Sequence, residues 1–191
     1  MPNGSLMNFF EKFFIDIPML KFISASIVLV LTYMRQQNLI HRDIKPSNVL
    51  IDNKFYTKVC DFGLSTYYVE GIQEFAGTRN FKAPEIDGKN CYSFSVDYYS
   101  LGQTLHLLRY ERYYQSKNSD SEDFSFIDDE DFIFYDLIKK LVRKNPEQRL
   151  GNHRIAEIYD HEFYHEYIFE EVENESILSP LIGAVPKVIN K

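Results

Sequence analysis

Cysteine is scarce in this sequence. Cys60 and Cys91 are the only two cysteines among 191 residues. They lack the CxxC spacing of zinc ligands, so the sequence predicts neither a disulfide framework nor a zinc site. Such cysteine usage is typical of the reducing cytosol or nucleus. We therefore expect a cytoplasmic or nuclear location.

An excess of positive charge is also lacking. The 21 lysines and arginines are outnumbered by 28 aspartates and glutamates, which gives a net charge of −7. Proteins that bind nucleic acid commonly present a basic stripe, so no nucleic-acid partner is expected. Hydrophobic residues make up 45% of the chain and aromatic residues 16%, which is typical of a globular domain.

Long hydrophobic runs and targeting segments are missing as well. The most apolar run, residues 22–34, is too short to cross a bilayer and contains Ser24, Ser26 and Thr32. The first residues show no charged segment ahead of an apolar core, so no signal peptide is predicted. We expect no membrane partner.

The first half of the chain shows a clear helical period followed by a hairpin pattern. Apolar residues recur at steps of three and four from Pro18 to Asn38, which predicts one long helix. A shorter helix is expected over residues 5–14. Two short runs flank a turn pair at residues 52–53, and they predict a β-hairpin. Residues 61–85 show no period and predict an ordered loop.

The second half is predicted to be helical around a polar insertion. We expect a buried helix that starts near Asp97, a solvated acidic loop over residues 115–131, and a helix over residues 132–142 that Pro146 ends. The weak period from Glu170 onward predicts a partly disordered tail.

Three motifs in order carry the chemistry of the sequence. Residues 41–48 read His-Arg-Asp-Ile-Lys-Pro-Ser-Asn, residues 61–63 read Asp-Phe-Gly, and residues 83–85 read Ala-Pro-Glu. A base, a cation two residues later and an amide three residues further can converge on one phosphoryl-transfer site. The next motif supplies a second metal-binding carboxylate. The order and spacing resemble those of the eukaryotic protein kinase family.

The resemblance implies a fold and an activity. The fold is mainly α: the helical C-terminal lobe of the protein kinase fold, with a small β-hairpin at the catalytic loop. It covers residues 1–165, and residues 166–191 form a C-terminal tail outside it. The implied activity is that of a protein serine/threonine kinase, which transfers the γ-phosphate of ATP to Ser or Thr of protein substrates and requires Mg²⁺.

The resemblance also assigns roles to residues of the three motifs. Asp43 is implied as the catalytic base that accepts the proton of the attacking hydroxyl. Asn48 and Asp61 are implied as magnesium ligands, because amide and carboxylate oxygens suit a hard cation. Lys45 is implied beside the transferred phosphate, and Thr78 beside the catalytic loop. A lysine and a threonine at these places resemble Ser/Thr kinases.

Three further residues are implied on the nucleotide side. Leu50 matches the apolar floor beneath adenine, although plain core packing explains a leucine here equally well. The opening segment Met-Pro-Asn-Gly-Ser-Leu resembles the segment that joins the two kinase lobes. This match places Met1 at the hinge position whose backbone bonds adenine, and Ser5 near the ribose.

Three residues match structural positions of the family. Glu85 and Arg149 match an ion pair beneath the substrate-binding segment. Asp97 matches the carboxylate that holds the catalytic-loop backbone, although Tyr99 stands in place of the usual tryptophan.

Residue 74 departs from the family pattern. In many kinases a phosphorylated threonine four residues before the position of Thr78 pairs with the arginine of His-Arg-Asp, which is Arg42 here. Counting back gives Glu74, whose carboxylate would offer Arg42 a permanent partner with one charge instead of nearly two. A solvated loop glutamate is the alternative explanation.

The 191 residues contain no counterpart of the smaller kinase lobe. They include no Gly-rich phosphate loop, no strand lysine for the nucleotide phosphates and no helix glutamate to pair with it. Two explanations stay open: an internal methionine taken as the start of a longer gene, or a truly reduced gene. The alternative function is therefore a non-catalytic half-kinase that acts as an interaction module, with a regulatory protein as partner.

The subfamily also stays open. Residues 149–151 with residues 157–163 resemble the end of cyclic-nucleotide-dependent-type kinase domains. Residues 77–85 look more like the cell-division-cycle kinase that triggers DNA replication.

Overall fold

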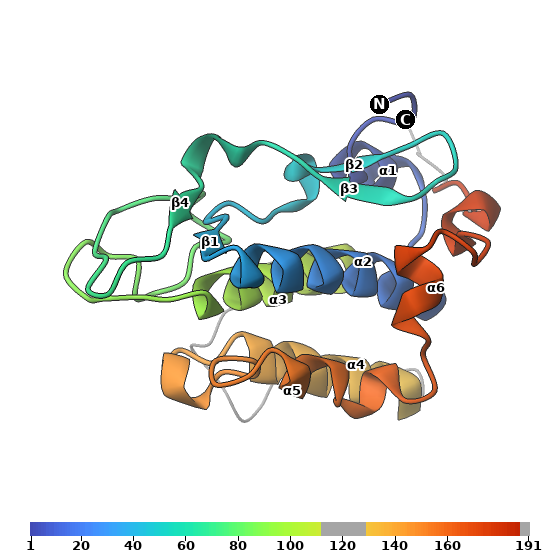
Figure 1. Cartoon of the computed structure of the whole chain (residues 1–191). Helices are drawn as coiled ribbons and strands as arrows, with labels where there is room; N and C mark the ends of the chain where they lie inside the picture. The colour runs from blue at the N-terminus through green and yellow to red at the C-terminus, as the bar shows by residue number, and fades with distance from the viewer. Residues whose placement is uncertain (112–128, 188–191) are drawn as a thin grey trace.

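Two helices side by side form the centre of the molecule. The computed structural model describes residues 1–111 and 129–187 (Figure 1). In Figure 1, α2 (Ile17–Gln36) and α3 (Ser95–Tyr110) make a middle layer, and α4 (Asp129–Leu141) with α5 (Ala156–Tyr159) makes a layer beneath it. The short strands and α1 (Leu6–Lys12) lie on the opposite side. The fold is mainly α-helical, as the sequence predicts.

Helix α2 begins where the sequence places a cap and a proline. The side chain of Asp16 accepts a hydrogen bond from the backbone N–H of Met19 at 2.9 Å, and Pro18 lies in the first turn. The helix ends at Gln36, and Asn38 follows with a φ of 55°, which is the left-handed region that asparagine tolerates. The predicted helix is confirmed to within two residues.

Helix α2 is longer than the apolar run of residues 22–34 within it. Its 20 residues are long and apolar enough to cross a membrane by length and composition. Within the fold, however, 61% of its most apolar window is buried. It packs against α3, α4, β3 and α6 (Phe169–Glu173), so it is the core helix of this fold.

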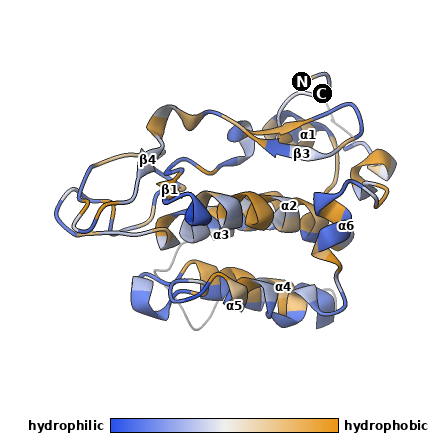
Figure 2. Ribbon diagram, viewed as in Figure 1, coloured by the Kyte–Doolittle hydropathy of each residue, from blue (hydrophilic) through white to orange (hydrophobic). Residues whose placement is uncertain are grey.

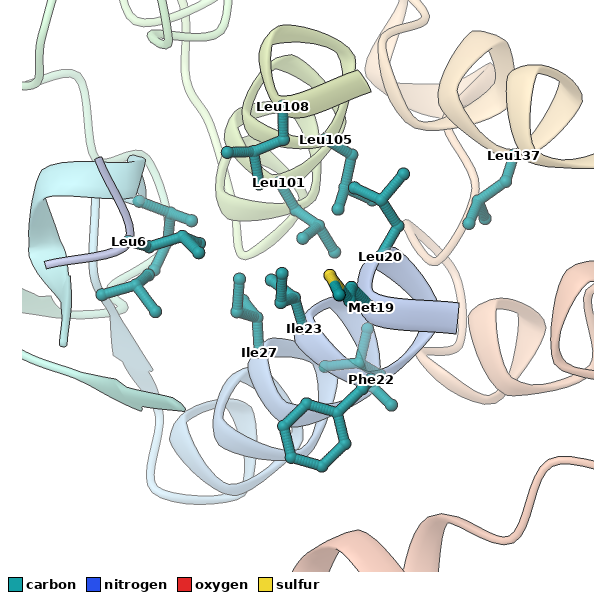
Figure 3. Packing of buried hydrophobic residues seen from close by; sticks show 14 of the residues in the cluster. Leu6, Met19, Leu20, Phe22, Ile23, Ile27, Leu101, Leu105, Leu108 and Leu137 are labelled. Carbon is teal, nitrogen blue, oxygen red and sulfur yellow. The ribbon is translucent and has the colours of Figure 1, made fainter. Parts of the chain in front are cut away.

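The main core lies between α2, α3 and α4. Figure 3 shows Ile23 and Ile27 of α2 facing Leu101 and Leu105 of α3, and these four side chains are fully buried. Figure 2 shows hydrophobic residues along α2, with others on α4 and on the β2–β3 hairpin. Burial of this kind stabilises a domain by about 25 cal/mol for each Å² of apolar surface removed from water.

Two antiparallel hairpin-like pairs flank the central helices. Strands β2 (Val49–Ile51) and β3 (Thr57–Val59) form the predicted hairpin, with Leu50 opposite Lys58. Strand β1 (Leu39–Ile40) pairs with β4 (Thr66–Tyr67). The prediction of a loop over residues 61–85 is wrong at β4 and at the 3₁₀ turn Phe62–Leu64, because a two-residue strand has no period to detect.

Two predicted boundaries move. Helix α3 begins at Ser95, two residues before Asp97. Helix α4 begins at Asp129, so the predicted acidic loop is wrong over residues 129–131, and residues 115–128 of that prediction lie outside the described residues. Acidic residues in the first turn of α4 face the positive end of the helix dipole. Asp131 also accepts a hydrogen bond from Arg109 Nε at 2.8 Å.

The chain after residue 165 packs against the core as far as it is described. Val172 of α6 and Leu181 of the 3₁₀ turn Pro180–Gly183 are buried, and both segments contact α2. Ser179 Oγ donates to the Phe55 carbonyl at 2.8 Å. Residue 186 pairs with residue 13 in an isolated β-bridge. These described residues have defined structure where the weak period predicted partial disorder. The other 3₁₀ turns are Pro46–Asn48, Pro146–Gln148 and Glu162–Tyr164.

Candidate active site

The carboxylate of Asp43 is the most heavily bonded side chain on the loop between β1 and β2. It is 95% buried, with a relative exposure of 5%. Its Oδ1 accepts from the hydroxyl of Thr78 at 2.6 Å and from the backbone N–H of Thr78 at 3.1 Å. Its Oδ2 accepts from Lys45 Nζ at 2.7 Å and from Asn48 Nδ2 at 2.9 Å. Three predicted site residues, Thr78, Lys45 and Asn48, therefore bond the carboxylate of a fourth, Asp43.

These contacts keep Asp43 ionised. Burial alone raises the pKa of Asp43, but the hydrogen bonds from Lys45 and Thr78 outweigh burial and hold the pKa below the usual aspartate value. Lys45 Nζ also donates to Thr78 Oγ1 at 2.7 Å, which closes a triangle of three side chains. The group is a charged acceptor at neutral pH, held in one orientation.

Asp97 holds the start of this loop. It is buried in α3, and its two carboxylate oxygens accept from the backbone N–H groups of His41 and Arg42 at 2.7 Å each. Arg42 has a φ of 68°, an unusual value for a residue with a side chain. Burial raises the pKa of Asp97, although these donors favour its charged form. The predicted bond from Asp97 to the loop backbone is confirmed.

Arg42 in turn binds the segment that carries Glu74. Arg42 Nη1 contacts Glu74 Oε2 at 2.6 Å and the hydroxyl of Tyr92 at 3.0 Å, while Nε donates to the Leu64 carbonyl at 2.6 Å. The Tyr92 hydroxyl donates to the Glu74 carbonyl at 3.0 Å. Arg42 is buried, whereas the Glu74 side chain is 65% exposed. The predicted contact between Arg42 and Glu74 is confirmed.

Gly77 is a site residue that the motif analysis did not single out. Its φ is 98°, and a Cβ placed on it would lie 2.6 Å from the Arg42 carbonyl oxygen. Only glycine allows residues 77–78 to approach the loop so closely. The glycine immediately before Thr78 was the available signal for this contact.

Glu85 and Arg149 join segments that lie far apart in the sequence. Arg149 Nη2 donates to Glu85 Oε2 at 2.9 Å, Nη1 also bonds Glu85 Oε1, and Arg149 is 1% exposed. Removing one partner of such a buried pair commonly costs about 3–5 kcal/mol. The Arg149 guanidinium lies 5.1 Å from the centroid of the Tyr99 ring, so the residue that replaces the usual tryptophan packs on this pair. The predicted ion pair is confirmed.

The opening residues lie along strand β2. Ser5 and Leu50 form a β-bridge, and the Ile51 N–H donates to the Gly4 carbonyl at 2.9 Å. Leu50 is half-buried and Met1 is 61% exposed. The Ser5 hydroxyl caps α1 by accepting from the Asn8 N–H at 3.2 Å. The structure thus brings Met1, Ser5 and Leu50 to one region, and their nucleotide roles stay predictions.

A comparison with known protein families identifies the family of the chain. Residues 1–164 match the protein kinase domain. The chain belongs to the protein kinase family. Because the match covers most of the chain, the mainly α fold is that of the helical kinase lobe.

Individual kinases are similar to the chain over most of its length. It is 30% identical over 173 residues to cAMP-dependent protein kinase type 3 of Saccharomyces cerevisiae, which covers 85% of this chain and 44% of that protein. It is 31% identical over 183 residues to serine/threonine-protein kinase sgk-1 of Caenorhabditis elegans, covering 89% and 39%. For atypical protein kinase C of Drosophila melanogaster the identity is 30% over 192 residues, covering 84% and 30%. The chain spans less than half the length of these relatives.

The kinase family implies Asn48 and Asp61 as magnesium ligands, and the chemistry of these two side chains suits the ion. Asn48 uses its Nδ2 to donate to the Asp43 carbonyl and to Asp43 Oδ2, both at 2.9 Å, which leaves the amide oxygen as an acceptor. Asp61 is exposed, and its Oδ1 accepts from the Gly63 N–H at 3.3 Å. Asp61 shares no hydrogen bond with Asp43 or Asn48, and the described residues contain no group of three His, Cys, Asp or Glu side chains that could hold a metal. This donor set suits Mg²⁺, which keeps waters and is completed by substrate phosphates.

Proposed function

We propose that this chain is the catalytic part of a protein serine/threonine kinase that transfers the γ-phosphate of ATP to Ser or Thr of protein substrates. The observation that supports this most is the contact of Lys45 and Thr78 with the Asp43 carboxylate, within 2.6–2.7 Å of its oxygens. The motifs that supply these residues resemble Ser/Thr kinases, and the relatives named above include a serine/threonine-protein kinase.

Asp43 is positioned to accept a hydrogen bond from the acceptor hydroxyl. Its oxygens are already bonded by Thr78, Lys45 and Asn48, so an entering hydroxyl joins or replaces one of these donors. The lowered pKa keeps Asp43 ionised at neutral pH, which orients the hydroxyl and lets the carboxylate take its proton. Phosphoryl transfer depends mainly on positioning and charge neutralisation, and fixed donors of this kind supply positioning.

Lys45 is placed to share its charge between base and phosphate. Its Nζ lies 2.7 Å from both Asp43 Oδ2 and Thr78 Oγ1, so the same ammonium group would also attract a phosphate bound beside Asp43. Asn48 and Asp61 would hold Mg²⁺, which when bound with ATP neutralises the phosphate charge. The proposed partners are protein substrates and a regulatory protein, and the proposed location is the cytoplasm or nucleus.

The test uses the protein expressed from its complete gene. With Mg-ATP and equal amounts of peptides that carry Ser, Thr or Tyr acceptors, we expect phosphoserine and phosphothreonine. Predominant phosphotyrosine would contradict the Ser/Thr assignment. No transfer to any acceptor from a folded protein would contradict the enzyme and favour a non-catalytic interaction module.

A further inference from the structure

Two cations lie on the segment that contacts the catalytic base. Thr78 bonds Asp43, Arg79 follows it directly, and Lys82 lies one turn further on. The backbone folds into a tight turn there, because the N–H groups of Phe81 and Lys82 donate to the Thr78 carbonyl at 3.0 and 2.9 Å. The turn that carries both cations is therefore joined to Asp43 through Thr78.

The stem of Lys82 packs beside Gly77, which itself lies against the catalytic loop. A Cβ built on Gly77 would lie 3.6 Å from Lys82 Cγ and 2.6 Å from the Arg42 carbonyl oxygen. Lys82 Nζ lies 3.3 Å from the centroid of the Phe75 ring, in a cation–π contact. Phe75 is 69% exposed, so an aromatic surface and an ammonium group border the site together.

Three acidic side chains of this region are paired with other cations, and a fourth, Asp87, acts on Lys82 through its charge without forming an ion pair with it. Asp43 pairs with Lys45, Glu74 with Arg42, and Glu85 with Arg149. Within residues 1–111 and 129–187, Arg79 and Lys82 form no ion pair. Arg79 is exposed and Lys82 is half-buried. Burial lowers the pKa of Lys82, and the charge of Asp87 offsets this only in part, so a bound anion would further stabilise the ammonium group.

We propose that the protein substrates of this site carry an acidic side chain, aspartate or glutamate, next to the phosphorylated Ser or Thr, and that Lys82 and Arg79 bind it. This inference rests on the proposed function and adds the substrate class to it. A carboxylate here meets one ammonium and one guanidinium, which form charge-assisted hydrogen bonds. The exposed Phe75 ring offers apolar contact to the same peptide.

The experiment measures kcat/KM of the protein from the complete gene on matched peptides. Each peptide has one serine, and Glu, Gln or Lys is placed in turn at each neighbouring position. We expect Glu at one position to exceed Gln by about tenfold or more and Lys to be the poorest, because charge-assisted hydrogen bonds are about twice as strong as neutral ones. High salt should reduce the preference.

Variants of the cations assign the preference to residues. Lys82→Met should bring the Glu-to-Gln ratio close to one, and Lys82→Glu should favour the Lys peptide. Arg79→Gln is a second variant, at an exposed position where folding is not at risk, and it should reduce the same ratio. Lys89→Met is the matched control, because Lys89 is an exposed lysine seven residues further along the chain. It should leave the ratio unchanged.

The outcomes separate this inference from the proposed function. Serine phosphorylation at equal rates for the Glu, Gln and Lys peptides would overturn the inference and leave the kinase assignment intact. A Glu preference that survives in both Lys82→Met and Arg79→Gln would overturn the assignment to these two residues. Failure to phosphorylate any peptide would overturn the proposed function, and the inference with it.

Discussion

Glu74 gives Arg42 a carboxylate partner without any modification of the chain. Its charge is about half that of a phosphate group at neutral pH. The contact is nevertheless supported on both sides, because Tyr92 bonds the Arg42 guanidinium and the Glu74 carbonyl together. The loop that bears Arg42 and Asp43 is thereby tied to the segment that bears Glu74.

Removing the Glu74 carboxylate should weaken the kinase activity, whereas removing phosphate groups from the parent protein should not. In Glu74→Ala, we expect kcat/KM to fall by roughly three- to tenfold, since a pair with one exposed member is worth about 1 kcal/mol. Phosphatase treatment of the unmodified protein should cost little. Glu70→Ala is the control, because Glu70 is exposed on the same segment. If dephosphorylation abolished activity and Glu74→Ala left it unchanged, a phosphate group and not Glu74 would be the partner that Arg42 needs.

Helix α3 approaches the C-terminal end of α4 closely at Gly102. A Cβ built on Gly102 would lie 2.7 Å from Val142 Cγ1 and 2.9 Å from Leu141 Cβ. Two effects compete when alanine is introduced there. Alanine favours a helix over glycine by about 1 kcal/mol, while overpacking a core contact costs about 1–3 kcal/mol. Both close atoms belong to buried, well-packed residues, so the clash prevails.

Gly102→Ala is therefore expected to lower the free energy of unfolding by up to about 2 kcal/mol, the difference between these effects. Denaturant unfolding followed by circular dichroism measures it. Gly183→Ala is the matched control: nothing lies within 4 Å of its added Cβ, and the change should be close to neutral. A Gly102→Ala protein as stable as the parent would show that α3 and α4 can separate freely.

Long regular elements were predictable from the sequence, and the two-residue strands and the start of α4 were not. The long period from Pro18 onward revealed α2, and the turn at residues 52–53 revealed the β2–β3 hairpin. The pair of β1 and β4 has two residues in each strand, too few for alternation to show. The start of α4 was mistaken for loop because its first turn is acidic, although acidic residues suit that end of a helix.

The candidate site was also predictable only in part. Ordered motifs predicted Asp43, Lys45 and Asn48, because their spacing is local. The contact of Thr78 with Asp43 crosses 35 residues and was predictable only through the family resemblance. Packing of Lys82 on Phe75 had no sequence signal, since cation–π contacts depend on how a loop folds back on itself.

The described part of the tail is joined to the β2–β3 hairpin by a small charge cluster. Glu175 accepts from Lys58 Nζ at 2.6 Å and from Lys54 Nζ at 2.9 Å. The hydrogen bonds from Lys58 and Lys54 lower the pKa of Glu175 to about 2. The described tail thus contacts both α2 and the hairpin whose strand β2 carries Leu50.

This cluster should make part of the stability depend on pH. A glutamate with a lowered pKa contributes fully above its unfolded value near 4.5 and loses that contribution as the pH falls toward 2. The difference in melting temperature between the parent and Glu175→Gln should therefore be larger at pH 7 than at pH 3. Its size at pH 7 should correspond to about 1 kcal/mol or less. Glu173→Gln, at an exposed neighbour, is the control. An equal difference at both pH values would show that the Glu175 charge adds no stability.

The rate of phosphoryl transfer by Asp43→Asn shows whether Asp43 is the catalytic base of a kinase. The substitution keeps the shape of the side chain and removes its charge, and a positioned general base contributes about 10²- to 10⁴-fold. At saturating Mg-ATP and peptide, with folding verified by circular dichroism, we expect the rate to fall by at least about 10²-fold. A folded Asp43→Asn protein that transfers phosphate at the parental rate would contradict the account.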